Sequence, residues 1–234
     1  MGVAENLAAV QAQISAACRR VGRDPGEVRL MPVSKTFGPE LIKEAYAGGA
    51  RIFGENRVQE AAQKARVLAG VPDLAWALIG HLQNNKVKQA VEVANEFQAL
   101  DSIKIAEALD RRLQQAGRSL DVLIQVNSSD EPQKHGLPPA EIKTFALQLK
   151  PLMSLNVRGL MTLAVLSDDQ SAVAACFIRM QKLQRQLRDL DDLPGSYDEL
   201  SMGMSGDFQL AIEHGATTVR VGQSIFGARP RQPG

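Results

Sequence analysis

The feature of this sequence that most constrains its fold is a repeated unit: a short aliphatic run, a polar or glycine-bearing turn, and a segment with helical hydrophobic spacing. Eight aliphatic runs of this kind follow one another, and each has the length of a buried strand. Strands that alternate with helices through short connections imply right-handed crossovers and a parallel sheet. The predicted strands span residues 28–34, 51–54, 75–79, 96–100, 121–126, 156–160, 199–201 and 218–221.

The segments between these runs read as amphipathic helices, and one further helix precedes the first strand. Residues 3–21 place Leu7, Val10 and Ile14 on a single apolar stripe, as the surface helix of a globular protein does. Similar stripes occupy residues 102–116 and 170–190.

Eight strand–helix units favour closure into a barrel over an open, doubly wound sheet. The open alternative is also weakened because no G-x-G-x-x-G sequence follows the first run, 28–34. We therefore expect an α/β fold, a single (β/α)₈ TIM-type barrel with an extra N-terminal helix. One domain covers 1–234, with the extra helix in 1–22 and a loose tail at 229–234.

Composition agrees with this fold and excludes some functions. Apolar residues make up 44% of the chain and aromatic residues 4%, so the core depends on aliphatic side chains, which suit buried parallel strands. A net charge of +1 offers no bulk field for nucleic acid or for a membrane surface. Cys18 and Cys176 lie on apolar helix faces and match no metal spacing. With neither a leader nor a membrane-length apolar run, we expect a cytoplasmic protein.

Lys35 stands at the end of the first strand, where barrels gather their functional groups. A lysine at a strand end is most often a solvated charge. In an enclosed barrel mouth, however, a partly desolvated lysine presents the neutral amine that attacks an aldehyde.

Two glycine-bearing loops follow the seventh and eighth strands. Residues 201–207 read SMGMSGD, and residues 219–224 read VRVGQS. Each loop alone is an ordinary turn or helix cap. Together they stand where barrels repeatedly bind phosphate, between the loops after strands seven and eight, so the sequence predicts a ligand that carries a phosphate.

Polar residues at other strand ends carry weaker signals. Asn56 follows the second strand and His81 the third, and either could cap a helix or bridge loops. His135 and His214 have no carboxylate or cysteine companion at metal-ligand spacing, so the sequence predicts no metal site.

Six stretches in this order resemble the YggS/PROSC-type pyridoxal phosphate homeostasis proteins, which are similar to the isolated barrel domain of fold-type III alanine racemases. The likeness covers nearly the whole chain. The stretches are VSKT at 33–36, FGENRVQE at 53–60, IGHLQNNK at 79–86, GLMT at 159–162, LSMGMS at 200–205 and VRVGQSIFG at 219–227.

The resemblance implies pyridoxal 5′-phosphate (PLP) as cofactor, held as a Schiff base on Lys35. It also implies that Arg220 faces the pyridine nitrogen, which would weaken the ring as an electron sink. Where many members have a small hydroxyl residue after the glycine, this chain has Gln223, which puts the affinity for phosphate in question. The implied cofactor-binding residues are Lys35, Asn56, Ser201, Gly203, Ser205, Arg220, Gly222 and Gln223.

Two functions remain open at this point. The first is a PLP carrier that maintains the intracellular cofactor and amino- and keto-acid pools without robust catalysis, with PLP-dependent enzymes as recipients and the chain as a monomer. The second is a weak fold-type III amino acid racemase. We expect the carrier, because the chain ends soon after its eighth strand and neither Tyr46 nor Tyr197 is placed as a second base. A barrel for another phosphorylated metabolite is a third possibility.

Overall fold

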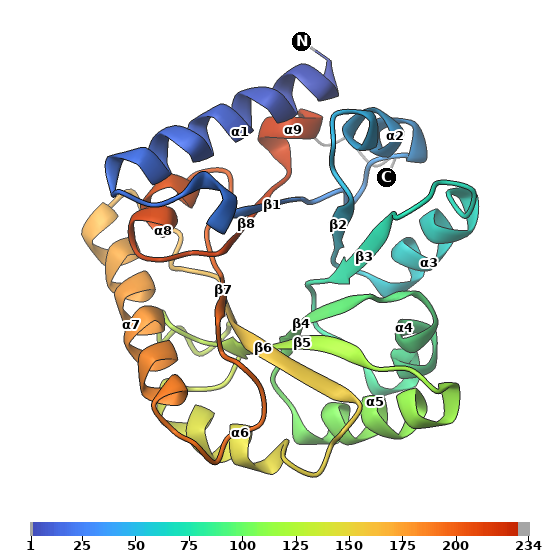
Figure 1. The fold of residues 1–234 in the computed structure, drawn as a ribbon, viewed down its shortest axis with the longest axis vertical. Coiled ribbons are helices and arrows are strands. Elements are labelled where there is room, and N and C mark those ends of the chain that lie inside the picture. Colours follow the sequence, from blue (N-terminus) through green and yellow to red (C-terminus); the bar gives the residue numbers. More distant parts are fainter. Residues whose placement is uncertain (1, 229–234) are drawn as a thin grey trace.

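The computed structural model describes residues 2–228, and within them eight parallel strands form one sheet around a central axis (Figure 1). The strand order is β1-β8-β7-β6-β5-β4-β3-β2. A parallel bridge between Val33 and Gly54 joins β1 to β2 and closes the ring. The strands are β1 (Arg29–Pro32), β2 (Ile52–Glu55), β3 (Ala75–Leu78), β4 (Glu96–Leu100), β5 (Leu120–Val126), β6 (Leu155–Thr162), β7 (Glu199–Ser201) and β8 (Thr218–Val221). The predicted TIM-type barrel is confirmed.

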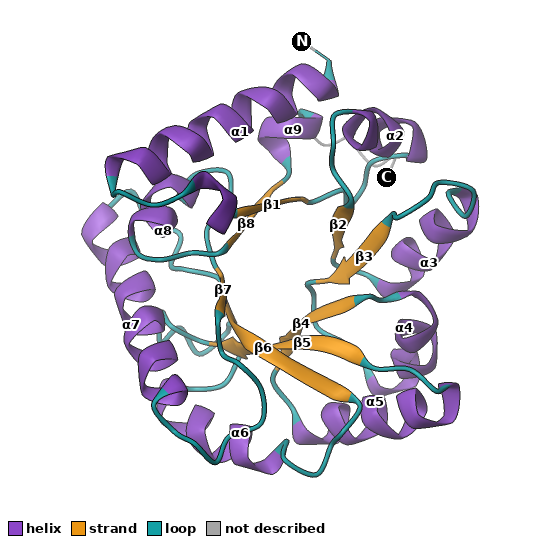
Figure 2. Cartoon of the chain, in the orientation of Figure 1, coloured by secondary structure: helices purple, strands orange, loops and turns teal. Residues whose placement is uncertain are grey.

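Helices surround the strands on the outside, as Figure 2 shows in purple around orange. They are α1 (Val3–Arg20), α2 (Pro39–Ala47), α3 (Val58–Val67), α4 (Val87–Val93), α5 (Ile103–Ala116), α6 (Ile142–Gln148), α7 (Gln170–Arg188), α8 (Phe208–Glu213) and α9 (Gln223–Phe226). Single 3₁₀ turns lie at η1 (Pro25–Glu27), η2 (Asn84–Lys86) and η3 (Pro139–Glu141).

The extra helix α1 lies across the outside of β8 and β1, beside the short helices α8 and α9 (Figure 1). Its inner stripe, which includes Leu7, Val10 and Ile14, is buried. Helices α8 and α9 span six and four residues. They are too short to cover this side of the sheet, so α1 supplies apolar cover that the usual alternation does not. The expected loose tail at 229–234 lies outside the described residues.

Six of the eight predicted ranges agree with the observed strands to within one residue at each end, and β1 and β6 differ by two residues at one end. The first run, 28–34, is paired as a continuous ladder only as far as Pro32, and Val33 makes an isolated bridge. Strand β6 runs from Leu155 to Thr162, because β5 is long enough to pair with it over this whole length. Strand length is thus set by the neighbouring strand as well as by local sequence.

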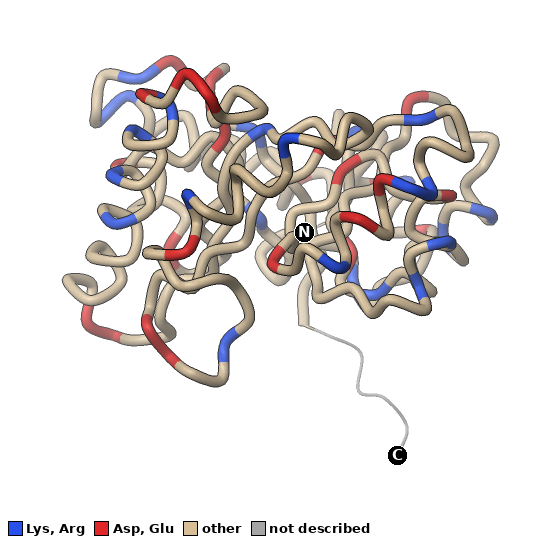
Figure 3. The backbone as a smooth tube through the Cα atoms, turned by 90° about the horizontal axis from the view of Figure 1, so that it is seen from below, with Lys and Arg blue, Asp and Glu red and all other residues tan. Residues whose placement is uncertain are grey.

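The core consists mainly of aliphatic side chains and the charged residues of both signs are mixed along the chain, as the composition predicts. Most of the buried apolar side chains form one cluster, and Cys18 and Cys176 are buried free thiols within it. Segments of both charge signs are interspersed along the chain in Figure 3. None of the helices in the described part of the chain is both long enough and apolar enough to span a membrane.

Candidate functional site

A cavity of about 540 Å³ lies at the carboxyl-terminal ends of the strands, which we call the mouth of the barrel. This volume is typical of a site for a small molecule. Its lining comes from the loops after β1, β2, β3, β6, β7 and β8. The lining residues are Val33, Lys35, Phe37, Asn56, Ile79, Leu163, Leu166, Met204, Ser205, Gly206, Arg220, Gly222, Gln223 and Gly227.

Lys35 lies in the turn directly after β1, partly buried, with its side chain in the cavity lining. The next residue, Thr36, has a positive φ of 71°, which is unusual for a β-branched residue. The Thr36 amide donates to Glu60 Oε1 at 2.6 Å. The turn therefore departs from regular geometry and is fixed by a side chain of α3.

A buried ion-pair cluster, formed by Lys64, Glu55 and Glu60, supports this turn from below. Lys64 Nζ donates to Glu55 Oε1, Glu60 Oε1 and the Ser34 carbonyl oxygen, each at 2.7 Å. Ser34 Oγ donates to the same Glu55 oxygen at 2.6 Å. Burial raises the pKa of Glu55, and the Lys64 ammonium opposes that shift. The backbone on both sides of Lys35 is thus held by one cluster.

The loops after β7 and β8 form the polar wall of the cavity. Ser205 and Gly206 come from the first loop, and Gly222 and Gln223 from the second. Among the described residues, the amides of Ser205, Gly206 and Gln223 donate to no backbone carbonyl. Such amides, gathered from two loops, can bind the oxygens of an anion.

The two loops are also joined to each other. The Arg220 amide donates to the Gly203 carbonyl oxygen at 3.0 Å. Gly203 has a φ of +93°, and a Cβ there would lie 2.6 Å from the Ala211 Cβ. A glycine is required at this position because the loop folds tightly back onto α8.

Arg220 is buried beneath the cavity, with 2% of its surface exposed. Its Nη1 donates to Ser201 Oγ at 2.5 Å, and its Nη2 donates to the Thr162 carbonyl oxygen at 2.7 Å. Burial lowers its pKa to about 10, and the charge of Asp207 opposes that shift. The side chain is therefore still a cation at neutral pH, and it offers hydrogen-bond donors and no acceptor.

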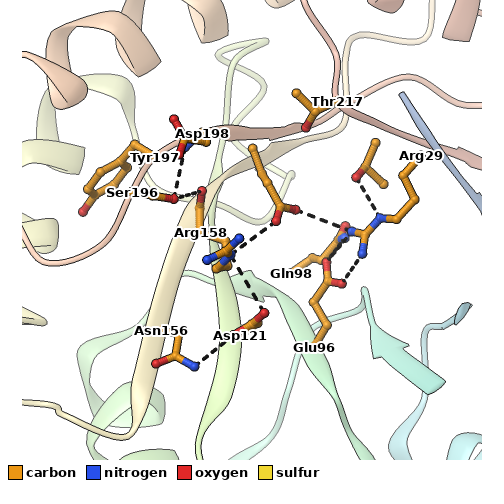
Figure 4. A network of polar contacts seen from close by, with 12 residues as sticks. Arg29, Glu96, Gln98, Asp121, Asn156, Arg158, Ser196, Tyr197, Asp198 and Thr217 are labelled. Carbon is orange, nitrogen blue, oxygen red and sulfur yellow. Dashed lines mark hydrogen bonds and ion pairs between the residues drawn. The ribbon is translucent and has the colours of Figure 1, made fainter. Parts of the chain in front are cut away.

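Hydrogen bonds continue from Arg220 down the inside of the barrel. Ser201 Oγ donates to Gln98 Oε1 at 2.6 Å, and Gln98 Nε2 donates to Glu96 Oε1 at 2.5 Å. Glu96 forms a bidentate pair with Arg29, with both N···O distances 2.9 Å (Figure 4). This polar column links the mouth to the opposite end of the strands, the base.

The structure brings most of the predicted site residues together. Lys35, Asn56, Ser205, Arg220, Gly222 and Gln223 all line the cavity. Within the described residues, the lining does not include Ser201 or Gly203. Ser201 is fully buried, with its hydroxyl bound to Arg220 and Gln98, so its place in the structure is as a support for Arg220.

Sequence reasoning missed two other groups at the mouth. Leu163, Leu166 and Met204 form an apolar rim, and Leu166 is 97% exposed. An apolar residue in a loop after a strand is a weak signal that could have indicated this rim. Lys64 and Glu55 carry no such signal, because a lysine and a glutamate nine residues apart read as surface charges.

The structure brings His135 close to two other possible metal ligands, while the expectation of no metal site stays a prediction. His81, Asp101 and His135 bring one potential metal-ligand atom each to within 4.8 Å of one another. They follow β3, β4 and β5, so no local spacing reveals them, and the sequence criterion of nearby companions fails for ligands that converge from separate loops.

A barrel whose mouth combines a lysine side chain, two amide-bearing loops and a buried arginine has the site architecture of (β/α)₈ proteins that bind a small phosphorylated ligand at the strand ends. The comparison with known proteins is more specific. The chain belongs to the family described as alanine racemase, N-terminal domain, whose model matches residues 6–230.

Relatives with similar sequences cover nearly the whole chain. The pyridoxal phosphate homeostasis protein of Pseudomonas aeruginosa is 41% identical, over 97% of this chain and 96% of its own length. The human protein of the same name is 38% identical, over 98% of this chain and 87% of its own.

Solved structures agree with the sequence relatives. PipY of Synechococcus elongatus, determined with PLP bound, has a TM-score of 0.85 and 39% identity, and covers 96% of this chain and 100% of that one. The alanine racemase of Streptomyces coelicolor is 22% identical with a TM-score of 0.71, and this chain covers 59% of its length. That more distant likeness shows a shared barrel fold.

Proposed function

We propose that this chain binds PLP at the mouth of the barrel and contributes to PLP homeostasis and amino- and keto-acid balance in the cell. The observation that carries the proposal is one cavity lined both by Lys35 and by the loops of Ser205 and Gly222. An aldehyde and a phosphate on one small ring require such a pair of groups. The names of the P. aeruginosa and human relatives, and the ligand bound to PipY, support the same assignment.

Each part of the cavity fits a part of PLP. Lys35 would hold the aldehyde as a Schiff base, and the amides of Ser205, Gly206 and Gln223 would hold the phosphate. Arg220 would donate a hydrogen bond to the pyridine nitrogen, and Asn56 lies within reach of the same cavity. Bound PLP supplies an electron sink for amino-acid chemistry, and an arginine donor at the ring nitrogen weakens that sink.

Lys35→Ala tests the assignment, with Lys43→Ala as the matched control. Lys43 is a half-exposed lysine on α2 that pairs with Glu40. Wild-type protein mixed with PLP is expected to show a yellow absorbance band, and borohydride should fix one pyridoxyl group per chain on Lys35. Lys43→Ala should behave as wild type and Lys35→Ala should lose the band. A band and a fixed adduct that persist in Lys35→Ala would overturn the proposal.

The site supports a carrier better than a racemase. In the described chain, Lys35 and Arg220 are the ionisable side chains that line the cavity. Tyr197 is 1% exposed in the loop before β7, at the base, and the Tyr46 ring lies under the Arg51 guanidinium at 4.1 Å. A second base on the opposite face of the ring is therefore lacking from the lining, and a general base contributes about 10²–10⁴-fold to a rate.

Racemase activity is the second candidate, because the fold relatives include an alanine racemase. A panel of L-amino acids, followed by chiral chromatography, separates the two functions. We expect turnover far below the enzymatic range of roughly 1–10³ s⁻¹. Turnover within that range would replace the carrier with the racemase.

We also propose that the protein is a cytoplasmic monomer that gives PLP to PLP-dependent enzymes. The apolar rim of Leu163, Leu166 and Met204 at the cavity supports contact with a recipient. When PLP-loaded protein is mixed with an apo-aminotransferase, aminotransferase activity should return faster than PLP dissociates from the loaded protein alone. Equal rates would contradict direct transfer.

A further inference from the structure

We propose that His81, Asp101 and His135 form a binding site for a divalent transition-metal ion of the zinc type at the mouth of the barrel. This site is separate from the PLP cavity and does not depend on the proposed function. The three side chains each place a ligand atom within 4.8 Å of the other two. A tetrahedral ion with bonds of about 2.1 Å holds its ligand atoms roughly 3.4 Å apart, so small side-chain rotations suffice.

The topology of the barrel explains why these residues meet. His81 follows β3, Asp101 directly follows β4, and His135 lies in the loop after β5. Adjacent parallel strands end at the same edge of a sheet, and the loops after their carboxyl ends build metal and catalytic sites in barrels. His81 and His135 are exposed, and an ion can therefore reach them from solvent.

The two imidazoles are already stacked on each other. Their ring centroids lie 4.5 Å apart, and the ring planes differ by 11°. Two exposed histidines from loops 54 positions apart in the sequence have no apolar burial to hold them in contact. The stacking places the two rings side by side, and because the lone pair of each ring nitrogen lies in the plane of its ring, a rotation of one ring out of the stack would bring a nitrogen of each ring to one ion.

Hydrogen bonds hold the backbone on both sides of His135 and also orient Asp101. The Gly136 amide donates to Asp101 Oδ2 at 3.2 Å, which orients the carboxylate and leaves its other oxygen for an ion. Gln125 Nε2 donates to the His135 carbonyl oxygen at 3.3 Å. Gly136 has a φ of +111°, and a Cβ there would lie 2.8 Å from the Asn127 nitrogen. The loop that carries His135 is therefore held against β5.

The surrounding charges favour a metal ion that bonds to imidazole nitrogen over one that needs several negatively charged oxygen ligands. Arg57 and Lys86 line a hollow next to His81, and their charges oppose any cation. Lys134 is directed away, toward the Ala164 carbonyl oxygen at 2.9 Å and the Glu131 carboxylate. Mg²⁺ and Ca²⁺ need several oxygen ligands, whereas two imidazoles and a carboxylate suit Zn²⁺. Three protein ligands leave a coordination position open to water or to a small anion.

The sequence contains three histidines, and this makes a matched test possible. His214 follows α8 at the base of the barrel, away from the cluster. Tag-free protein, stripped with a chelator, would be titrated with Zn²⁺ against a chromophoric zinc chelator. We expect one equivalent of Zn²⁺ in the wild type and in His214→Asn. Loss of a residue that only hydrogen-bonds to a metal ligand lowers metal affinity about 10–100-fold. Loss of a ligand itself, in His81→Asn or His135→Asn, should therefore lower the affinity for Zn²⁺ by at least roughly 100-fold.

Further measurements make every outcome decisive. Far-UV circular dichroism identifies any variant that has not folded. Asp101→Asn is then measured in place of that variant, because the Asn amide oxygen can still accept the hydrogen bond from the Gly136 amide while the charge of the metal ligand is lost. Lys35→Ala should keep its zinc, since that ion does not depend on PLP. The proposal is wrong if the wild type takes up no Zn²⁺, if both histidine variants bind like His214→Asn, or if Lys35→Ala loses the ion.

Discussion

The two ends of the barrel each contain an ion-pair cluster around one buried carboxylate, Glu55 or Glu96, and the two clusters have different structural roles. At the mouth, Lys64 pairs with Glu55 and Glu60 and holds the backbone on both sides of Lys35. At the base, Arg29 pairs with Glu96 and also lies 3.6 Å from Glu199. The first cluster lies between a turn and a helix, whereas the second joins the first residues of three strands.

Similar ion pairs can therefore either position a reactive group or join the strands of a sheet. Glu96, Glu199 and Arg29 belong to β4, β7 and β1, so the base cluster crosses the interior of the barrel (Figure 4). It joins residues of these three strands, and none of its members lines the cavity. Lys64 also has no place in the cavity lining, yet it contacts the residue that precedes Lys35. Substitutions at the two ends should therefore separate stability from ligand binding.

The largest expected effect is that of Lys64→Met at the mouth. Removal of one partner of a buried pair leaves an uncompensated charge and typically costs about 3–5 kcal/mol. Glu55 has no exposed side-chain surface, so we expect a loss of this size in urea denaturation, together with weaker PLP binding by the folded fraction. The double variant Lys64→Met/Glu55→Gln should regain part of the lost free energy of unfolding, but not the lost affinity for PLP. Full PLP binding by Lys64→Met would contradict a positioning role.

Glu96→Gln at the base should have a smaller effect, of a different kind. A hydrogen bond to a charged group contributes about 1.5–3 kcal/mol, and this variant keeps the shape of the side chain while it removes the charge that Arg29 pairs with. We expect a loss within that range by urea denaturation, with PLP affinity per folded molecule unchanged. Asp198→Ala is the control, because its pair with Arg188 is exposed and should contribute less than about 1 kcal/mol. Weaker PLP binding in Glu96→Gln would erase the distinction between the two ends.

Ser201→Ala and Ser205→Ala test which hydroxyl lies in the ligand site. Ser201 is bonded to the buried Arg220 cation and to Gln98, so its removal should cost about 1.5–3 kcal/mol of stability and weaken PLP binding less than the removal of the Ser205 hydroxyl does. Ser205 lines the cavity, and its loss should weaken PLP binding by about fivefold at little cost in stability. Equilibrium dialysis and thermal melts measure the two effects. The reverse result would restore Ser201 to its predicted phosphate role.

The smallest effect concerns the pH dependence of stability at the base. Burial raises the pKa of Glu199 above its usual 4.5, although Arg29 and Arg158 oppose the shift. Above pH 4.5 the folded protein then binds more protons than the unfolded chain, so this contribution to stability is lost as the pH rises through the folded pKa. Glu199→Gln should flatten that part of the stability curve. An unchanged slope would show that the carboxyl titrates normally.

Much of the fold could be predicted because it depends on local patterns. Runs such as 96–100 (EFQAL) and 218–221 (TVRV) match the observed strands residue for residue, since polar and apolar residues alternate over most of each short run. Lys35, Ser205 and Gly222 could be named because barrel loops at known strand ends meet in one place. Ser201 could not be separated from Ser205 by sequence, because the choice depends on which hydroxyl Arg220 reaches.

Taken by itself, the sequence determined the eight strand–helix units, the lysine after the first strand and the glycine loops after the last two, since hydrophobic periodicity and turn residues act over a few positions. Tertiary structure alone decided that Lys64 supports the turn of Lys35, that Ser201 supports Arg220, and that His81, Asp101 and His135 converge. These contacts join residues from separate loops and strands. Their distances follow from closure of the barrel, which no local pattern specifies.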